Sequence, residues 1–436
     1  MNLLIIANYF APMNSVGAQR PNAWARYWPS FGSTVTVLTS RKREAITDGF
    51  FPAGVSVVDV NWHGKSREIN SRQTSKPDSP RTMPDKKLGK NIIKYVVDVH
   101  RWLKRKFFCN YLDSRSLWIL FAYPVACKII KSKNIQVVVS TSPAYPVHVL
   151  ARKLKKKFPE LIWMADYRDL WSGNPMFPGS AIVRKIEMLH EKRVMRYADI
   201  VTTISEPLAK YLGMLLNRTD VNVYYNGYEK TDVIRGGGSD IKNGNTFISI
   251  VYTGSVLPGL HNPEPLFAAI SHLHRCGKID PAQLKIMFYG DATAIRERVC
   301  NDTVLCRYVE LIGSVSRHEA LNAQASADAL LFLGARQNGG AATDGVVSGK
   351  IFEYMTSGTE VIAIGVTPDM SVGQLIGRSR IGDIYSNDVE LISCRIERLV
   401  CEGKVKLDLD YNYICNFRRD VQAKEIHKLI VNKSVK

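Results

Sequence analysis

The chain has 436 residues, of which 45% are hydrophobic and 23% charged, and its formal net charge at pH 7 is +19. This length and apolar content favour two folded domains. No apolar stretch is long enough to cross a bilayer. The eight scattered cysteines argue against a disulfide framework or a zinc site. The excess of Lys and Arg predicts an anionic partner, which is a nucleic acid, a phosphorylated small molecule or a membrane surface.

Short apolar runs alternate with helix-length amphipathic stretches along the chain. The strands predicted in the first half are 3–7, 35–38, 55–60, 137–140, 162–165, 200–204 and 221–224. Those predicted in the second half are 248–252, 285–289, 309–312, 329–333 and 361–364. β-Branched runs separated by helical spacers indicate βα units, and so two parallel sheets covered by helices. We expect no signal peptide, because the first residues lack a basic region and read as a strand.

Two predicted strands of the first half end in loops with chemically capable residues. The turn 8–21 contains Gly17, which permits close backbone approach at the start of the next helix. A later strand ends at Asp166, Arg168 and Asp169, and two carboxylates beside a guanidinium suit acceptor binding or proton handling. The alternative is a structural Asp–Arg ion pair that fixes the loop.

The basic residues are concentrated in two segments, 94–106 and 152–157. Trp, Phe and Leu are interleaved with Lys and Arg around the first, a composition that suits an interfacial helix on anionic lipid. The alternative is a solvated basic face packed on the protein. Nucleic acid is disfavoured, because no known nucleic-acid-binding pattern accompanies the charge. The polar segment 63–85 reads as a loop, and the Gly-rich segment 226–245 as the connection between domains.

The second half carries a phosphate-binding pattern. A small-residue turn with Gly254 and Ser255 ends its first strand. Further on, Ser348 is predicted to cap a helix that carries Lys350 in its first turn and Glu353 in its middle. Exposed N–H groups beside a cation can bind a diphosphate, and the carboxylate can accept hydrogen bonds from sugar hydroxyls. The alternative is an ordinary amphipathic helix. The tail 411–436 is predicted to form one basic helix, and the D-x-D at 408–410 is interpreted as a chance match.

Several segments match one family in their order along the chain. They are 9–21, 31–32, 34–39, 140–143, 166–171, 198–205, 226–228, 252–255, 326–331 and 348–354. With them the chain resembles the glycosyltransferases of family 4, most closely a bacterial subgroup associated with surface-polysaccharide synthesis. The resemblance implies the GT-B fold, an α/β architecture of two Rossmann-like domains with parallel sheets facing across a cleft. The domains would be 1–225 on the acceptor side, 226–405 on the donor side, and a C-terminal helix in 406–436 that returns to the first domain.

The resemblance also implies a function. It is transfer of a sugar from a nucleotide-sugar donor, with retention of configuration and without a metal or other cofactor. The acceptor would be a saccharide, in lipid-linked form, in capsule, O-antigen or exopolysaccharide synthesis. We expect the enzyme in the cytoplasm, peripheral on the inner face of the bacterial membrane, with an anionic membrane surface as partner and no nucleic acid.

The site residues follow from matching the family's segments to this chain. The expected catalytic residues are Asp166, Arg168, Asp169 and Glu353. The expected donor-binding residues are Gly17, Gly254, Ser255, Arg336, Ser348, Gly349, Lys350 and Glu353. Among these, a Glu matching Glu353 binds ribose hydroxyls in the family, and the loop around Gly17 approaches the donor phosphates.

The chain departs from the family at three places, one of which is the strand exit, where Asp166 or Asp169 stands in place of the His of many relatives. Gly345 stands where relatives carry the first of two Glu residues, and the segment 255–260 lacks their Arg and Lys. We infer that Lys350 and Arg336 bind the phosphates instead. These departures keep two alternatives open, a catalytically inactive scaffold that binds membrane or partners and a nucleotide-sugar epimerase of the same fold.

Overall fold

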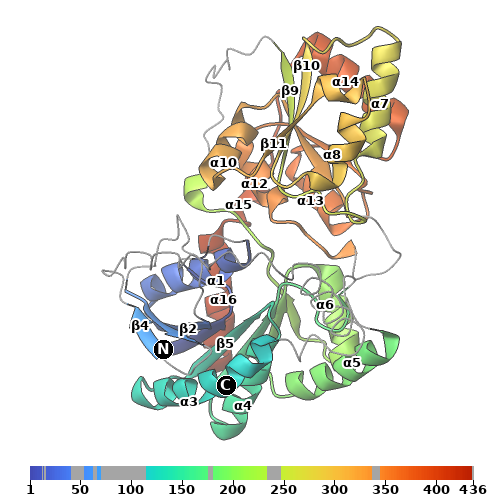
Figure 1. The fold of residues 1–436 in the computed structure, drawn as a ribbon. Helices are drawn as coiled ribbons and strands as arrows, with labels where there is room; N and C mark the ends of the chain where they lie inside the picture. Colours follow the sequence, from blue (N-terminus) through green and yellow to red (C-terminus); the bar gives the residue numbers. More distant parts are fainter. Residues whose placement is uncertain are drawn as a thin grey trace, which may run out of the picture. The chain divides into compact units, whose positions relative to one another are not determined.

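The computed structural model describes residues 1–11, 13, 16–40, 54–61, 66–69, 114–174, 180–232, 247–335 and 344–434. The chain forms two compact units (Figure 1). Unit 1 comprises Met1–Ile204, Leu208–Tyr224 and Ala423–Lys436, and unit 2 comprises Ser205–Pro207 and Tyr225–Gln422. The basic segment 94–106, Arg336 and most of the predicted loop 63–85 lie outside the described residues.

Unit 1 is built on an eight-stranded sheet with the order β4-β3-β2-β1-β5-β6-β7-β8. Its strands are β1 (Asn2–Ala7), β2 (Thr34–Ser40), β3 (Ser56–Val60), β4 (Ser66–Ile69), β5 (Val137–Ser142), β6 (Ile162–Tyr167), β7 (Ile200–Thr203) and β8 (Val221–Val223). Neighbours are parallel except β3 and β4, which are antiparallel. The seven parallel strands confirm the prediction, whereas β4 was expected to be loop.

Helices cover both faces of the unit 1 sheet. They are α1 (Val16–Tyr27), the 3-10 helix η1 (Trp28–Phe31), α3 (Ser114–Ser132), α4 (Pro146–Lys157), α5 (Ala181–Met195), α6 (Glu206–Leu216) and α16 (Arg419–Ser434). On one face, Trp24 and Trp28 form a core with strand residues such as Leu3 and Ile5 and with α16. On the other, α4 packs beside α3 and α5. Right-handed crossovers place α1 and α4 on opposite faces, because β2 and β6 lie on opposite sides of the β1–β5 pair.

The end of the chain completes unit 1, as the GT-B fold implies. The predicted single helix 411–436 is wrong in detail, because α15 (Tyr411–Cys415) and α16 are separate helices. Between them the backbone pairs with Tyr228, whose N–H donates to Phe417 O, 3.1 Å away, and whose carbonyl accepts from Arg419 N at 3.0 Å. Past this break, the Trp28 indole N–H donates to Ala423 O at 3.0 Å, and Ile426 and Ile430 enter the core.

Unit 2 is built on a six-stranded parallel sheet with the order β11-β10-β9-β12-β13-β14. Its strands are β9 (Ile248–Thr253), β10 (Leu284–Tyr289), β11 (Val309–Gly313), β12 (Ala329–Leu333), β13 (Val361–Ile364) and β14 (Gly382–Ser386). Its helices, besides α15, are η3 (Lys230–Asp232), α7 (Glu264–Arg275), α8 (Thr293–Cys300), α9 (Leu305–Tyr308), α10 (Arg317–Ser326), α12 (Lys350–Ser357), α13 (Ser371–Ser379) and α14 (Val389–Glu402). The first five strands confirm the prediction, and β14 was not predicted.

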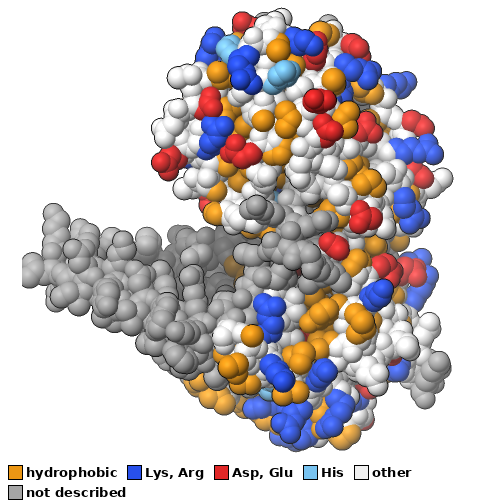
Figure 2. Space-filling view, turned by 90° about the vertical axis from the view of Figure 1, so that its right-hand side faces the viewer, with side chains coloured by type: hydrophobic (Ala, Val, Ile, Leu, Met, Phe, Trp, Pro, Cys, Tyr) orange, Lys and Arg blue, Asp and Glu red, His pale blue; other side chains and the backbone are white. Residues whose placement is uncertain are grey.

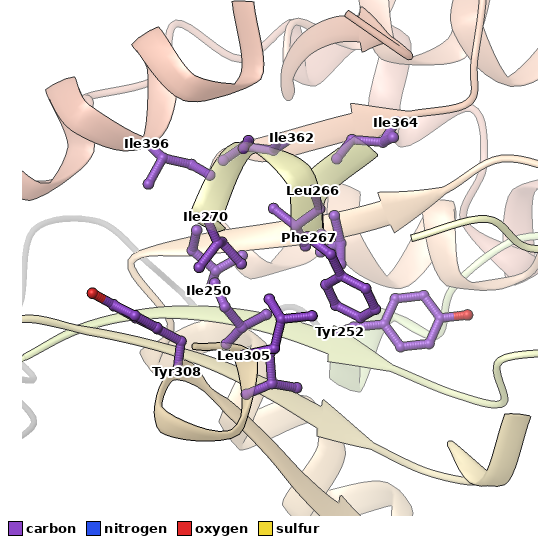
Figure 3. Close-up of a cluster of buried hydrophobic side chains, with 14 of the residues drawn as sticks. Ile250, Tyr252, Leu266, Phe267, Ile270, Leu305, Tyr308, Ile362, Ile364 and Ile396 are labelled. Atoms are coloured by element: carbon purple, nitrogen blue, oxygen red, sulfur yellow. The ribbon is translucent and has the colours of Figure 1, made fainter. Parts of the chain in front are cut away.

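Each face of the unit 2 sheet carries its own core. Ile250 and Tyr252 point to the face covered by α7 and α14, where they pack with Phe267 and Ile396 (Figure 3). Val251 points to the opposite core, which also contains buried residues of α12 and α13. Because side chains alternate between faces, a strand buried on both sides must be apolar throughout, which explains the continuous runs in the sequence.

Candidate functional site

In unit 2, two glycines bring the carboxyl ends of neighbouring strands together. Gly254 follows β9 with φ +117°, a conformation that L side chains rarely adopt. Gly290 follows β10, and a Cβ there would lie 2.5 Å from Gly254 O. A Cβ on Gly254 would overlap the Lys350 side chain. The strand ends therefore pack closely and leave room for one long cationic side chain from α12.

Lys350 is held by an aromatic ring rather than by an acid. Its ammonium donates to the Tyr252 hydroxyl at 2.5 Å and lies 4.0 Å from the ring centroid. Burial lowers its pKa to about 8, and the charge of Glu353 opposes that shift. No carboxylate of the described residues is within ion-pair distance of it. Burial, and then the charge of Lys350, lowers the pKa of nearby His261 to about 4, so the imidazole stays neutral. The arrangement is suited to receive an anion.

Glu353 lies one turn after Lys350 on α12 and is oriented by two weak hydrogen bonds. Arg317 Nη2 donates to Glu353 Oε1 and Gln324 Nε2 to Oε2, each at 3.4 Å. Arg317 is committed more strongly to Asp232, with hydrogen bonds of 2.9 and 2.7 Å to its two oxygens. The Glu353 side chain is 20% exposed. Its carboxylate is fixed in direction but can still accept hydrogen bonds from a ligand.

This group is completed by Arg317, Gln324, Asp232 and Tyr252, none of which was predicted from the sequence as a site residue. Arg317 begins α10, whose capping box between Ser316 and Glu319 is the only local signal near it. Asp232 lies in η3, within the segment 226–245 that was predicted to connect the domains. Arg317 contacts both Asp232 and Glu353 only because the fold brings α10, α12 and η3 together.

The other predicted donor-side residues are placed less directly. Gly349 is the N-cap of α12, so the cap predicted for Ser348 is wrong by one position. Ser348 Oγ accepts only a long hydrogen bond, 3.4 Å, from Lys350 N. The helix ends at its C-cap Gly358, which has φ +72°. Ser255 is exposed in the turn after β9, and its carbonyl accepts from the Tyr252 hydroxyl at 2.9 Å.

In unit 1, Asp166 is fully buried at the carboxyl end of β6. It accepts hydrogen bonds from Arg20 at 2.8 Å, Thr141 at 2.7 Å and Thr202 at 2.8 Å. These partners come from α1, β5 and β7. Asp166 thus ties three neighbouring elements together. An Asp–Arg pair does form, but its arginine is Arg20 of α1 and not the adjacent Arg168.

Arg168 connects the carboxyl end of β5 and the loop after it with the first turn of α1. Its guanidinium donates to three backbone carbonyls, those of Ser142 at 2.7 Å, Pro143 at 3.3 Å and Gly17. A Cβ on Gly17 would lie 3.2 Å from Arg168 Nη1, so the glycine permits this approach. Burial lowers the pKa of Arg168. Asp169, by contrast, is exposed, and of Asp166, Arg168 and Asp169 it is the one whose side chain reaches solvent.

A buried acid supports the loop behind Asp169. Glu191 of α5 is completely buried and accepts from the Tyr167 hydroxyl at 2.9 Å and from Ser172 N and Oγ at 3.0 and 2.5 Å. Burial raises its pKa to about 7, against these hydrogen bonds, which lower it. One turn earlier, Glu187 accepts from the Trp171 indole N–H. These hydrogen bonds therefore hold the segment that follows β6 against α5.

Across the described ranges, no three side chains of His, Cys, Asp or Glu gather closely enough to hold a metal ion. None of the helices within those ranges has the length and apolar character needed to cross a bilayer. The two aspartates of the D-x-D have other partners, since Asp408 pairs with Arg380 at 2.7 Å and Asp410 caps α15.

Comparison with known proteins establishes the fold. No protein-family model matches the chain, and no curated protein matches its sequence. Among solved structures, it is similar to a glycosyltransferase from Rickettsia africae ESF-5, with 12% identity over 99% of this chain and 98% of that one and a TM-score of 0.58. It is also similar to the lipopolysaccharide outer core galactosyltransferase WaaB in its apo form, with 14% identity, 99% and 100% coverage and a TM-score of 0.55.

A third similar structure is the N-terminal domain of trehalose-6-phosphate phosphatase from Candida albicans, with 10% identity, 99% and 97% coverage and a TM-score of 0.58. At these identities the likeness concerns architecture alone. Together with the two parallel sheets, it confirms the predicted GT-B class of two Rossmann-like domains. Membership of family 4 stays a prediction.

Proposed function

We propose that the chain is a retaining, family 4-like glycosyltransferase that moves a sugar from a nucleotide-sugar donor to a saccharide acceptor. The observation that carries the proposal is the presence of both Lys350 and Glu353, one turn apart, on α12. One is a partly buried cation held by an aromatic ring, and the other is an oriented carboxylate that can still accept hydrogen bonds. Three residues of a helix rise by about 4.5 Å, a spacing that suits a diphosphate and the ribose beside it.

In this proposal each donor-side residue has a distinct task. Lys350 stabilises the negative charge that grows on the leaving diphosphate, and Gly254 leaves space for its side chain. Glu353 accepts hydrogen bonds from the ribose hydroxyls. Arg317 and Gln324 are positioning residues that hold the Glu353 carboxylate in one orientation. This assignment supplies a phosphate-binding cation where the segment 255–260 has none.

We place the acceptor-binding residues on unit 1, around Asp169. Asp169 is exposed, whereas Asp166 and Arg168 are buried and fully engaged in holding strand ends and loops. We therefore assign Asp166 and Arg168 positioning roles. In the transfer step, the bond from the anomeric carbon to the diphosphate oxygen breaks, and a bond to the acceptor oxygen forms on the same face. The acceptor proton passes to the departing diphosphate.

Calorimetry with UDP, GDP, TDP and CMP, with and without EDTA, tests the donor site. We expect one nucleotide to bind independently of EDTA. Glu353→Ala should weaken binding about 30-fold, because it removes hydrogen bonds to a charged group worth about 2 kcal/mol. Glu390→Ala, an exposed acid on α14, is the matched control and should bind normally.

Three other results would contradict the proposed donor site or reaction. Absence of binding for all four nucleotides would refute the donor site and favour a scaffold that has lost catalysis, as Gly345 in place of the first Glu allows. Equal loss in Glu353→Ala and Glu390→Ala would show that α12 is not the binding element. A bound nucleotide-sugar that changes configuration without any acceptor would identify an epimerase.

A further inference from the structure

The exposed side of α5 in unit 1 carries three large aliphatic side chains. Ile182, Ile186 and Leu189 are 74%, 55% and 57% exposed. Their spacing of four and three residues places them in one stripe along the helix. Single exposed apolar residues are common on protein surfaces, but a stripe of three large aliphatic side chains on one helix is not.

The charges on this helix are distributed unevenly. The exposed basic side chains are Arg184, Lys185, Lys192 and Arg193 on α5 and Arg196 just after it. The only acids of α5 are Glu187 and Glu191, which are turned inward and buried. The surface of α5 therefore combines aliphatic and positively charged groups and presents no exposed acid.

The neighbouring helices extend the same character. Lys153 and Lys157 of α4 lie 6.0 and 5.4 Å from the ring centroid of Tyr123 on α3. Arg152 and Lys156 lie 5.3 and 5.9 Å from that of Tyr197, which follows α5. On α3, the exposed aliphatic residues are Leu117 and Leu120. Figure 2 shows hydrophobic and basic side chains side by side on the flank of unit 1 where α5 lies.

We infer that α5, with the adjoining surfaces of α3 and α4, is a docking surface for an anionic lipid bilayer. Aliphatic side chains enter the boundary between headgroups and acyl chains, while Lys and Arg contact the lipid phosphates. A second copy of the chain is a poor occupant, because pairing two such faces would bring like charges together. The inference is independent of nucleotide binding, since none of these residues belongs to the donor site.

Co-sedimentation of the full chain with vesicles tests the inference. We expect binding to vesicles that contain phosphatidylglycerol, little binding to pure phosphatidylcholine, and weaker binding at high salt. Ile186→Ser and Arg193→Glu should each weaken binding about tenfold. The matched controls in unit 2 are Leu391→Ser, whose side chain is 54% exposed, and Lys406→Glu, and both should bind as the unchanged chain does.

Three outcomes would overturn the inference. Binding that is equally strong with neutral vesicles would exclude the charge-dependent surface. Unchanged binding in both α5 variants would place the lipid contact elsewhere, for example in the segment 94–106. A dimer in solution that Ile186→Ser converts to monomer would identify a second copy as the occupant. Tryptophan fluorescence melts of the α5 variants should match that of the unchanged chain, in which case a loss of binding reports on the surface and not on folding.

Discussion

Replacement of Asp166 by Ala should destabilise unit 1 strongly. The change removes the acceptor of three hydrogen bonds and leaves the Arg20 guanidinium, now without its carboxylate, largely buried. Hydrogen bonds to a charged group contribute about 1.5–3 kcal/mol each, and breaking a buried ion pair costs about 3–5 kcal/mol. These contributions overlap, because one carboxylate makes all of them. We expect a loss of about 4 kcal/mol, or roughly 10 °C in Tm for a unit of this size.

The sequence provides a probe for unit 1 alone. All seven tryptophans lie at or before Trp171, so tryptophan fluorescence follows the unfolding of unit 1, whereas far-UV circular dichroism follows both units. Denaturation of Asp166→Ala should shift the fluorescence transition and leave the part of the circular dichroism signal due to unit 2 in place. Asp169→Ala, which alters an exposed carboxylate, should change stability by less than about 0.5 kcal/mol.

The result that would refute this reasoning is a stable but inactive Asp166→Ala. A fluorescence midpoint equal to that of the unchanged chain, together with loss of sugar transfer, would mean that Asp166 contacts the substrate. Its buried hydrogen bonds would then be incidental to folding. A large loss of stability, with activity that recovers at low temperature, would support the positioning role.

Three further predictions concern protonation and space. Between pH 4.5 and 7, native Glu191 retains a proton that the unfolded chain loses, so the contribution of Glu191 to stability falls as pH rises. Burial lowers the pKa of His148 to about 3, so below pH 6.5 the unfolded chain binds a proton that the native chain does not, and stability falls as pH falls. In Glu191→Gln, fluorescence-detected unfolding should therefore show stability that only decreases as pH falls below 6.5. Nucleotide affinity measured by calorimetry should decline above about pH 8, where Lys350 loses its charge, and Lys350→Met should bind weakly at every pH. Gly254→Ala should weaken binding by displacing Lys350, and combining it with Lys350→Met should add little, because both changes act on one ammonium group.

Most of the strands that the sequence predicted are buried on both faces, although the partly buried edge strands β8 and β11 were predicted as well. Runs such as Leu3–Ala7 are apolar throughout, because helices cover both sides of the sheet. The missed strands, β4 and β14, are short edge strands of mixed polarity, each paired with one neighbour only. Pairing with a neighbour distant in the sequence decides their structure, and no local pattern signals it.

The candidate site divides in the same way. Lys350 and Glu353 could be predicted, because one helix carries both and Gly358 marks its end. Arg317 and Asp232 are 85 positions apart, and Arg20 and Asp166 are 146 apart. Such pairs exist only after the sheets have formed. The groups available for chemistry could therefore be predicted from the sequence, but the partners that orient them could not.

The split composition of unit 1 has a consequence for synthesis on the ribosome. Residues from Ala423 onward belong to the core of unit 1, but they are translated after the whole of unit 2. When Tyr224 has emerged, the indole N–H of Trp28 still lacks its carbonyl partner, and the apolar surface that Ile426 and Ile430 will cover is open. All core residues of unit 2 have been translated before Ala423. Unit 1, whose first residues are translated first, is therefore the last unit to be completed. Until α16 has been translated, we expect chaperones and proteases to bind this exposed apolar surface of unit 1.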